Sequence, residues 1–359
     1  MRVAISTGGG DAPGLNAVIR AAVLSALHRR FEVFGIRRGF GGLLDEGQIV
    51  PMGREEVRGI THLGGTILGT TNRGNPFKWP VRKPDGTWGE VDRSDELIGR
   101  FRELKLDALI MVGGDGSLRI GYDLWRKGFP IVGVPKTIDN DVGGTVITFG
   151  YDTAVTTATD AIDKVHSTAE SHERVMVVEV MGRYAGWIAL NAGLAGSADV
   201  ILLPEIPYDI DRVAEKIRQR EAEGRHFSIV VVAEGAVPKG GGVVVKEGAK
   251  AGTLERLGGV GEVVARQIAD VTGKETRSLV LGHLQRGGSP TTFDRLLGLR
   301  FGAAAVRAVA EGRFGHMVAS VPPDIKFVPL EEALAKPRPV PLDNDTIQTA
   351  RELGVCLGD

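Results

Sequence analysis

Short apolar runs rich in β-branched residues alternate with helix-like stretches along most of this chain. The runs are residues 3–6, 108–112, 131–134, 175–180, 229–233 and 278–281. Continuous runs of this kind predict strands that are buried on both faces of a parallel sheet. Apolar residues from Leu15 to Leu27 then recur on one face of a helix, and similar patterns cover residues 154–166, 210–223, 260–272 and 295–311. The alternation predicts a doubly wound α/β fold.

The length of 359 residues suggests two domains, since a domain commonly has about 150 residues. Residues 137–150 are dense in Asp, Asn and Gly just before a predicted helix, so we expect a boundary near residue 150. Residues 77–95 contain prolines and an Asp-Gly pair, which are typical of an exposed hairpin or loop. Prolines recur between residues 329 and 341, and they indicate that the last residues form an appendage.

The chain is nearly neutral, with 44 Lys and Arg against 45 Asp and Glu and a net charge of −1. We therefore expect no nucleic-acid or membrane partner, and any phosphate binding has to be local. The single cysteine, Cys356, excludes an intramolecular disulfide and a cysteine-based zinc site. No stretch approaches the roughly 20 apolar residues that span a bilayer, so we expect a cytoplasmic protein.

Glycine is unusually frequent, with 51 residues, and one cluster lies at residues 7–16 between a predicted strand and a predicted helix. Glycines at such a place let backbone N–H groups approach an anion at a helix N-terminus. The segment is not a Walker A loop, because no Gly-Lys-Ser/Thr follows. A plain tight turn is the alternative for this segment taken alone.

A second glycine-rich segment, residues 111–118, also follows an apolar run. Ligands of open α/β sheets bind at that edge of the sheet. Asp115 would hold Mg²⁺, directly or through water, beside phosphates that glycine amides bind. The alternative is a glycine-rich turn with a helix-capping Asp or Ser.

A third segment, residues 135–142, places Asp139 and Asp141 two residues apart after another apolar run. In extended backbone these carboxylates point to one side, and one of them could accept a substrate proton. Lys136 adds a cation and Thr137 a hydroxyl group. An Asx-turn is the alternative for Asn140 and Asp141, but it explains Asp139 less well.

Five segments, in order and spacing, resemble motifs of the phosphofructokinases: residues 8–16, 113–117, 135–141, 179–183 and 282–290. The resemblance covers about residues 1–320 and is closest to the branch whose members use ATP or pyrophosphate. It implies two doubly wound, Rossmann-like three-layer domains with the active site in the cleft between them. Residues 1–150 and 285–335 would bind MgATP, 151–284 would bind fructose 6-phosphate, and 336–359 would form the appendage.

The resemblance also implies a role for each matched residue. Asp139 matches the base that takes the proton from the sugar 1-hydroxyl, and the catalytic set is Gly9, Thr137, Asp139 and Arg183. The donor set is Gly9, Arg73, Gly114, Asp115, Gly116, Ser117 and Lys136, with Asp115 as the Mg²⁺ ligand. The sugar set is Thr137, Asp139, Asp141, Arg174, Met181, Gly182, Arg183, Glu234, Arg277, His283 and Arg286.

Within the sugar set, His283 and Arg286 would clamp the 6-phosphate, while Arg174 and Arg277 would reach it from a neighbouring subunit. Such an arrangement suits phosphoryl transfer, which needs in-line positioning and charge neutralisation more than covalent chemistry. Taken singly, each of these arginines fits an ordinary surface ion pair, and His283 fits a structural histidine. The joint pattern is what favours binding roles.

Two positions bear on the phosphoryl donor, and they point in different directions. Gly116 matches ATP-using members, because a missing side chain leaves room for the nucleotide where pyrophosphate-using members carry Asp. Lys136 matches the pyrophosphate-using members instead. An Asp at position 116 would exclude the nucleotide, whereas a Lys at position 136 could still bind ATP, so Gly116 is the stronger indication. We therefore expect an ATP-dependent 6-phosphofructokinase of glycolysis. The alternative is a pyrophosphate-dependent phosphotransferase.

The resemblance further implies a homo-oligomer, because Arg174 and Arg277 would act across a subunit interface. A homotetramer is expected, with a dimer as the alternative. Arg20 matches one arginine of the effector site of bacterial members, but Leu24 stands where a second arginine is usual, so effector control of that type is not expected. A non-catalytic sugar-phosphate sensor would lack Asp139 or Asp115, and both are present.

Overall fold

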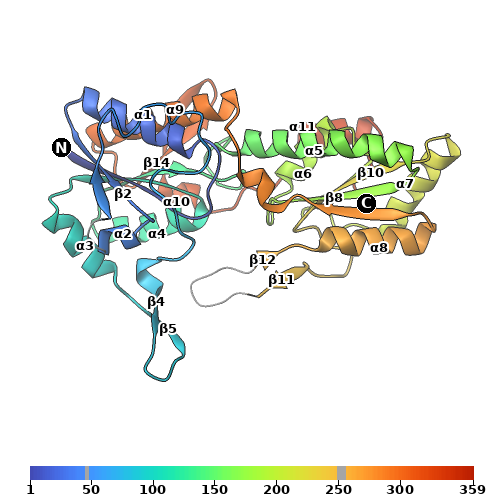
Figure 1. Ribbon diagram of the computed structural model, residues 1–359, viewed down its shortest axis with the longest axis horizontal. Helices are drawn as coiled ribbons and strands as arrows, with labels where there is room; N and C mark the ends of the chain where they lie inside the picture. Colours follow the sequence, from blue (N-terminus) through green and yellow to red (C-terminus); the bar gives the residue numbers. More distant parts are fainter. Residues whose placement is uncertain (45–47, 249–255) are drawn as a thin grey trace. The chain divides into compact units, whose positions relative to one another are not determined.

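The computed structural model (Figure 1) describes residues 1–44, 48–248 and 256–359. These residues form two compact units, each described here by itself. Unit 1 contains Met1–Asp152 and Arg286–Pro337, and unit 2 contains residues 153–248, 256–285 and Arg338–Asp359. No helix of the described ranges has the length and apolar character needed to cross a membrane.

Unit 1 is built on a 7-stranded sheet with the order β15-β14-β7-β6-β1-β2-β3. The strands are β1 (Arg2–Thr7), β2 (Glu32–Ile36), β3 (Ile49–Pro51), β6 (Ala108–Gly113), β7 (Ile131–Pro135), β14 (His316–Val321) and β15 (Asp324–Pro329). The strands from β14 to β2 pair in parallel, whereas β15 and β3 are antiparallel edge strands. The predicted runs at 3–6, 108–112 and 131–134 therefore form the centre of a parallel sheet.

Helices cover both faces of this sheet, because neighbouring residues of a strand point to opposite sides. Val3 and Ile5 of β1 belong to the core cluster that includes α1 (Leu15–His28) and α9 (Thr292–Ala310). Ala4 belongs to the other cluster, with side chains of the remaining helices. Those helices are α2 (Gly41–Leu44), α3 (Ser94–Glu103), α4 (Asp115–Arg126) and α10 (Leu330–Ala333). Unit 1 is thus the three-layer domain that the alternation predicts.

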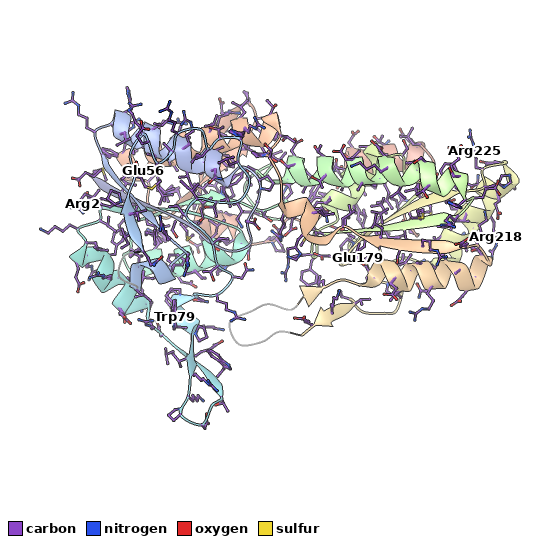
Figure 2. The ribbon with its side chains drawn as sticks, viewed as in Figure 1. Arg2, Glu56, Trp79, Glu179, Arg218 and Arg225 are labelled. Atoms are coloured by element: carbon purple, nitrogen blue, oxygen red, sulfur yellow. The ribbon has the colours of Figure 1, made fainter. Side chains whose placement is uncertain are left out.

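The segment predicted as an exposed hairpin or loop is a hairpin. A short 3₁₀ helix, η1 (Pro76–Lys78), leads into β4 (Trp79–Arg82), which pairs antiparallel with β5 (Trp88–Val91). Trp79 lies at the start of this hairpin (Figure 2), and the guanidinium of Arg93 lies 5.1 Å from the centroid of its ring. Trp88 is exposed.

Unit 2 has a 4-stranded parallel sheet with the order β13-β8-β10-β9. The strands are β8 (Val175–Val180), β9 (Val200–Leu202), β10 (Ser228–Ala233) and β13 (Thr276–Val280). The helices are α5 (Tyr151–Ser171), α6 (Trp187–Ala195), α7 (Ile210–Ala222), α8 (Val260–Thr272) and α11 (Asp345–Glu352). Residues of α7 and α8 form one core cluster on the sheet, and Figure 1 shows α5 on the side opposite α8. A small ribbon pairs β11 (Val245–Glu247) with β12 (Arg256–Leu257).

The run at residues 278–281 differs from the expectation that it is buried on both faces. It forms most of β13, an edge strand, and the exposed fractions of Leu279 and Val280 are 37% and 53%. Position in the sheet, which a local apolar run does not encode, decides this exposure. Because neighbouring strand residues point to opposite sides, β13 is exposed on both of its faces among the residues that the structure describes.

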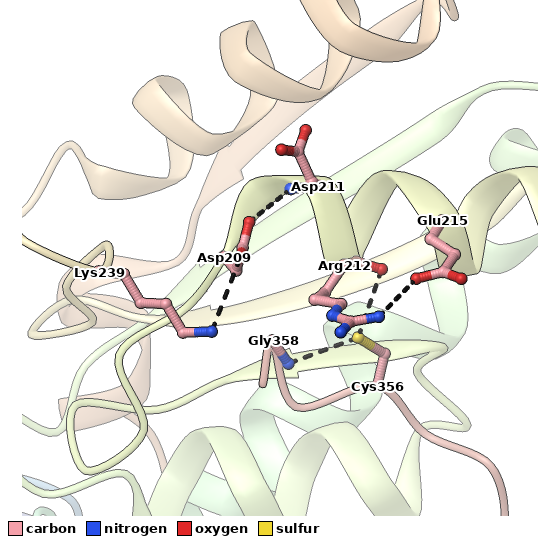
Figure 3. Close-up of polar contacts among 7 residues, drawn as sticks. All are labelled: Asp209, Asp211, Arg212, Glu215, Lys239, Cys356 and Gly358. Atoms are coloured by element: carbon pink, nitrogen blue, oxygen red, sulfur yellow. Dashed lines mark hydrogen bonds and ion pairs between the residues drawn. The ribbon is translucent and has the colours of Figure 1, made fainter.

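The C-terminal residues Arg338–Asp359, which lie in the segment predicted as an appendage, pack within unit 2. Cys356 bridges to Val200 of β9, and its carbonyl oxygen accepts a hydrogen bond from Ile201 N at 2.9 Å. Figure 3 shows the Cys356 thiol against the carbonyl oxygen of Arg212, at 3.8 Å, at the start of α7. Leu357 is buried, which anchors the end of the chain in the core.

Candidate active site

Three predicted site segments meet at one edge of the sheet in unit 1. They follow β1, β6 and β7, which are adjacent and parallel, so their carboxyl ends lie together. Gly8 N donates to the carbonyl oxygen of Val112 at 2.9 Å, and Lys136 N donates to that of Gly113 at 2.9 Å. The sequence-predicted segments 8–16, 113–117 and 135–141 are therefore neighbours in space.

Glycines allow these segments to approach each other closely. A Cβ atom on Gly8 would lie 2.9 Å from the hydroxyl oxygen of Ser117, and one on Gly10 would lie 2.9 Å from a guanidinium nitrogen of Arg286. Real Cβ atoms do not pack at such distances, so a larger residue would displace the side chain of Ser117 or of Arg286. The result is an edge that presents backbone groups and only a few side chains.

Lys136 is a buried cation among these segments. Its side chain is 3% exposed, and its ammonium group donates a hydrogen bond to the carbonyl oxygen of Gly10. The pKa of Lys136 is lowered to about 8, mainly by burial and also by the charge of Arg286, while Asp139, Asp11 and Asp141 act in the opposite direction. The positive charge is therefore held near neutral pH at the place where we expect phosphates to bind.

Asp139 has a carboxylate oxygen that is available for chemistry. The residue is 4% exposed, and its backbone N–H donates to the hydroxyl oxygen of Thr137 at 3.0 Å. Its Oδ1 atom is buried and has no hydrogen-bond partner among the residues that the structure describes. Buried polar atoms are nearly always satisfied, so this oxygen can accept a hydrogen bond from a ligand, as the prediction of Asp139 as the base requires.

The neighbouring Asn140 has a structural role instead. Its backbone is left-handed, with φ of 54°, and its side-chain oxygen accepts a hydrogen bond from Thr148 N at 3.1 Å. Thr148 also donates its hydroxyl to the carbonyl oxygen of Thr137, at 2.8 Å. These contacts fix the turn that presents Asp139 and the half-buried Asp141.

Asp115 and Gly116 open helix α4 at the same edge. Gly114 is the N-cap residue, Asp115 is exposed, and Ser117 is partly buried. A Cβ atom on Gly116 would meet no described atom within 4 Å beyond its chain neighbours and the backbone of its own helix. The space in front of Gly116 is thus open to a ligand.

The donor set around Asp115 fits Mg²⁺ when the substrate supplies further oxygens. The described residues contain no group of 3 or more His, Cys, Asp or Glu side chains that could hold a metal by themselves. Mg²⁺ commonly binds through one or two carboxylates, phosphate oxygens and water. A single carboxylate beside phosphate-binding amides is therefore a suitable ligand.

Gly9 and the segment of Arg73 are bound to each other. Gly9 has φ of 78°, its N–H donates to the carbonyl oxygen of Thr71 at 3.0 Å, and its carbonyl oxygen accepts from the Thr70 hydroxyl at 2.5 Å. Arg73 is exposed two residues further on. Because the Gly9 N–H already has a partner, it would have to exchange Thr71 for a phosphate oxygen to act as predicted.

Arg286 lies beside the glycine-rich loop in unit 1. Its Nη1 atom donates to the carbonyl oxygen of Asp11 at 3.1 Å. The resemblance assigns this residue to the 6-phosphate of the sugar. Its contact with the loop after β1 brings a second cation close to Lys136, as the effect on the pKa of Lys136 indicates.

In unit 2, the predicted sugar segment follows β8 and is held by its backbone. Met181 N donates to the side-chain oxygen of Gln285 at 3.3 Å, and Arg183 N donates to Glu234 Oε1 at 3.0 Å. Gly182 and Arg183 both have positive φ, 140° and 52°. Glu234 follows β10, the neighbour of β8, so Met181, Gly182, Arg183 and Glu234 are brought together.

Gln285 is a residue that the sequence-based site set lacks. It is fully buried, and besides accepting from Met181 N it donates to the carbonyl oxygen of Gly282 at 3.1 Å. It therefore ties the sugar segment to the 3₁₀ helix η2 (Gly282–Arg286), on which His283 is exposed. The sequence signal that could have identified Gln285 is its position inside the motif at 282–290.

Arg174 and Arg277 lie at the opposite end of the same sheet. Arg174 precedes β8, and Arg277 pairs with Met176 near the amino end of that strand. Both guanidinium groups contact Glu275, at 3.1 and 2.8 Å. At about 3.3 Å per strand residue, they lie on the order of 20 Å from the segment after β8. Within one chain they are separate from Met181 and His283.

Two residues of α1, Arg20 and Leu24, occupy the positions that the sequence comparison relates to the effector site of bacterial members. Arg20 donates to the carbonyl oxygen of Val57 at 2.6 Å, and Leu24 packs against the core cluster of unit 1. Leu24 thus has an apolar packing role.

Comparison with known proteins decides the family. A family model described as Phosphofructokinase matches residues 2–309. The chain belongs to the phosphofructokinase family. A curated relative from Chloroflexus aggregans, named ATP-dependent 6-phosphofructokinase, is 52% identical over 359 residues, which cover 100% of this chain and 98% of that protein.

The names of the phosphofructokinase relatives include more than one phosphoryl donor. A protein from Amycolatopsis methanolica, named pyrophosphate–fructose 6-phosphate 1-phosphotransferase, is 50% identical over 95% of this chain and 96% of its own length. The solved structure of phosphofructokinase from Saccharomyces cerevisiae matches with a TM-score of 0.78 and 31% identity, over 98% of this chain and 47% of that chain. This chain spans about half the length of the yeast chain. The phosphofructokinase fold of two Rossmann-like domains is thus confirmed.

Proposed function

We propose that this chain is an ATP-dependent 6-phosphofructokinase. It transfers the γ-phosphoryl group of MgATP to the 1-hydroxyl of fructose 6-phosphate, which gives fructose 1,6-bisphosphate in glycolysis. The observation that carries this proposal is the buried Asp139 Oδ1 atom, which has no partner among the described residues and lies in the same buried segment as the Lys136 cation. A base and a phosphate-binding cation are the two elements that the reaction needs.

In the proposed reaction, Asp139 accepts the proton of the sugar 1-hydroxyl. The oxygen of that hydroxyl then forms a bond to the γ-phosphorus, the bond from the γ-phosphorus to the β–γ bridging oxygen breaks, and ADP leaves with that oxygen. Thr137 fixes the backbone of Asp139. Gly9, Arg73, Lys136 and Arg183 would surround the transferred group with N–H donors and positive charge.

Mg²⁺ would bind through Asp115 together with donor phosphate oxygens, and it would neutralise phosphate charge. Gly114, Gly116 and Ser117 would line the donor at the start of α4, where helix N–H groups favour an anion. Unit 1 would thus be the donor domain and unit 2 the sugar domain, through Met181, Gly182, Arg183, Glu234 and His283. Thr137, Asp139, Asp141 and Arg286 would complete the sugar contacts.

ATP as donor is supported by the open space at Gly116, which an Asp side chain would fill with negative charge. It is also supported by the name of the relative from Chloroflexus aggregans, which matches this chain along its whole length. Lys136 favours pyrophosphate in the sequence comparison, but a cation there also suits the γ-phosphate of ATP. Pyrophosphate is therefore the second candidate.

A homotetramer with shared active sites is part of this proposal. Arg174 and Arg277 face Glu275 at the amino end of the unit 2 sheet. They are too far from Met181 to bind the same sugar within one chain. A neighbouring subunit would receive them at its 6-phosphate, and the exposed side chains of the edge strand β13 leave surface for such contacts. The cytoplasmic location stays a prediction.

A steady-state assay tests the proposal. The purified full chain is given fructose 6-phosphate and Mg²⁺ with either ATP or pyrophosphate, and fructose 1,6-bisphosphate is measured. We expect kcat/KM with ATP to exceed that with pyrophosphate by at least tenfold, about 1.4 kcal/mol in transition-state free energy. Turnover with pyrophosphate alone would show that pyrophosphate, and not ATP, is the phosphoryl donor. The absence of turnover with either compound would overturn the proposed function.

A further inference from the structure

Three side chains that are remote in sequence accept hydrogen bonds from three N–H groups of the segment from Met181 to Gly186. Gln285 binds Met181 N and Glu234 binds Arg183 N, as described above. Glu205, which follows β9, accepts one bifurcated hydrogen bond from Gly186 N, at 2.9 Å through Oε1 and 3.2 Å through Oε2. The segment is therefore tied at its start, middle and end.

Glu205 also binds the C-terminal segment. Its Oε1 atom accepts a hydrogen bond from Val340 N at 2.8 Å. A second contact lies next to it, where the indole N–H of Trp187 donates to the carbonyl oxygen of Arg338 at 2.9 Å. The Arg338 guanidinium lies 4.4 Å from the centroid of the Trp187 ring. Gly186 and Trp187 are thus joined to the chain at Arg338 and Val340.

The space around Gly186 makes this connection tight. A Cβ atom on Gly186 would lie 2.7 Å from Glu205 Oε2 and 2.8 Å from a methyl group of Leu203. Hydrogen bonds to an ionised carboxylate are stronger than those between neutral groups. A shift of the Glu205 carboxylate would therefore be passed to Gly186, where α6 begins, and to the turn at Gly182 and Arg183.

We propose that Glu205 is a positioning residue of the sugar site, and that through Glu205 the C-terminal segment Arg338–Asp359 sets the affinity of this site for fructose 6-phosphate. The inference rests on the proposed function, because Met181, Gly182 and Arg183 are sugar contacts there. Glu205 would act through the backbone of this segment, which it binds at Gly186 N. It holds the end of the segment that contains these sugar contacts.

The test compares Glu205→Ala and Glu205→Gln with the wild-type full chain. We expect Glu205→Ala to raise the KM for fructose 6-phosphate about tenfold, because a charged acceptor of backbone N–H groups is lost. The KM for ATP and kcat should stay within about twofold, and hydrogen exchange should speed up in residues 181–187. Glu205→Gln keeps an acceptor oxygen for both N–H groups and should restore most of the affinity.

Trp187→Phe is a second variant, which removes the indole N–H donor to Arg338 and keeps an aromatic ring, and it should raise the same KM by a smaller factor. Asp209→Ala is the matched control, because the Asp209 side chain also accepts a backbone N–H in unit 2, from Asp211 at 3.0 Å. Its backbone N–H, which donates to the carbonyl oxygen of Gly358 at 2.7 Å, is kept in the variant. Asp209→Ala should lower the melting temperature and leave the KM unchanged.

Different results would overturn the positioning role of Glu205 and the proposed function of the chain. An active wild type with an unshifted KM for fructose 6-phosphate in Glu205→Ala would overturn the positioning role alone. Equal loss of kcat and of both affinities, without rescue by Glu205→Gln, would also overturn it, since that is the result of general damage. A wild type inactive on fructose 6-phosphate would overturn the proposed function and this inference with it.

Discussion

The ammonium group of Lys136 donates a hydrogen bond to the carbonyl oxygen of Gly10, so a buried cation joins the end of β7 to the glycine-rich loop after β1. Both partners lie where the donor phosphates are proposed to bind. The charge of this side chain depends on pH in the range used for enzyme assays, because burial lowers its pKa to about 8.

This lowered pKa predicts the pH dependence of ATP use. Lys136 is charged below about pH 8 and neutral above it. The value of kcat/KM for ATP, which reports groups of the free enzyme, should therefore fall as the pH rises through about 8. The Lys136→Met variant should lack this step, and a step of equal size in the variant would show that another group causes it.

Replacement of the proposed base should separate chemistry from binding. Asp139→Ser should lower kcat by about 10²- to 10⁴-fold, the usual contribution of a general base. The affinity for fructose 6-phosphate, measured by calorimetry, should change little. The melting temperature should not fall, because the substitution removes a buried carboxylate whose Oδ1 has no partner among the described residues. A mild effect on kcat would contradict the assignment.

A side chain at position 116 should affect the donor and not the fold. Gly116→Asp adds a carboxylate where no described atom, beyond the chain neighbours and the backbone of the helix itself, lies within 4 Å of the Cβ position, and acidic residues suit the first turn of a helix. We expect kcat/KM for ATP to fall at least about 100-fold through charge repulsion, at an unchanged melting temperature. Gly116→Ala is the matched control, and an equal loss there would point to steric effects.

Mixing of inactive variants tests the shared site. Asp139→Ser and Arg277→Ala subunits, unfolded and refolded together, should recover activity, because an intact site takes Asp139 from one subunit and Arg277 from its neighbour. Random equal mixing leaves about a quarter of the sites intact in a symmetric oligomer. Asp139→Ser mixed with Gly116→Asp should recover none, since both changes fall on unit 1 of the same chain. Absence of recovery in the first mixture would contradict a shared site.

Much of the fold could be predicted because its signals are local. The runs that become β1, β6, β7, β8 and β10 are apolar without alternation, as strands buried on two faces require. The segments after β1, β6 and β7 could be grouped for the same reason, since parallel neighbours bring their carboxyl ends to one edge. Asp139 and Lys136 therefore lie among the glycine-rich segments, as the sequence indicates.

The features that could not be predicted depend on contacts between distant residues. The exposure of Val280 follows from the position of β13 at the sheet edge. The apolar run at residues 278–281 does not indicate this position. The bond from Val340 N to Glu205 joins residues 135 positions apart, and the bond from Met181 N to Gln285 joins residues 104 apart. Neither pairing has a local pattern, so only the folded chain reveals it.

The order of strands in unit 1 also has a consequence for synthesis of the chain. The strand β7 ends at Pro135, but its neighbour β14 begins only at His316. At about 5 to 20 residues per second, a ribosome needs on the order of 10 s or more to make the residues between them. During that interval one edge of β7 has no strand beside it, and pairing with another nascent chain competes with completion of the sheet.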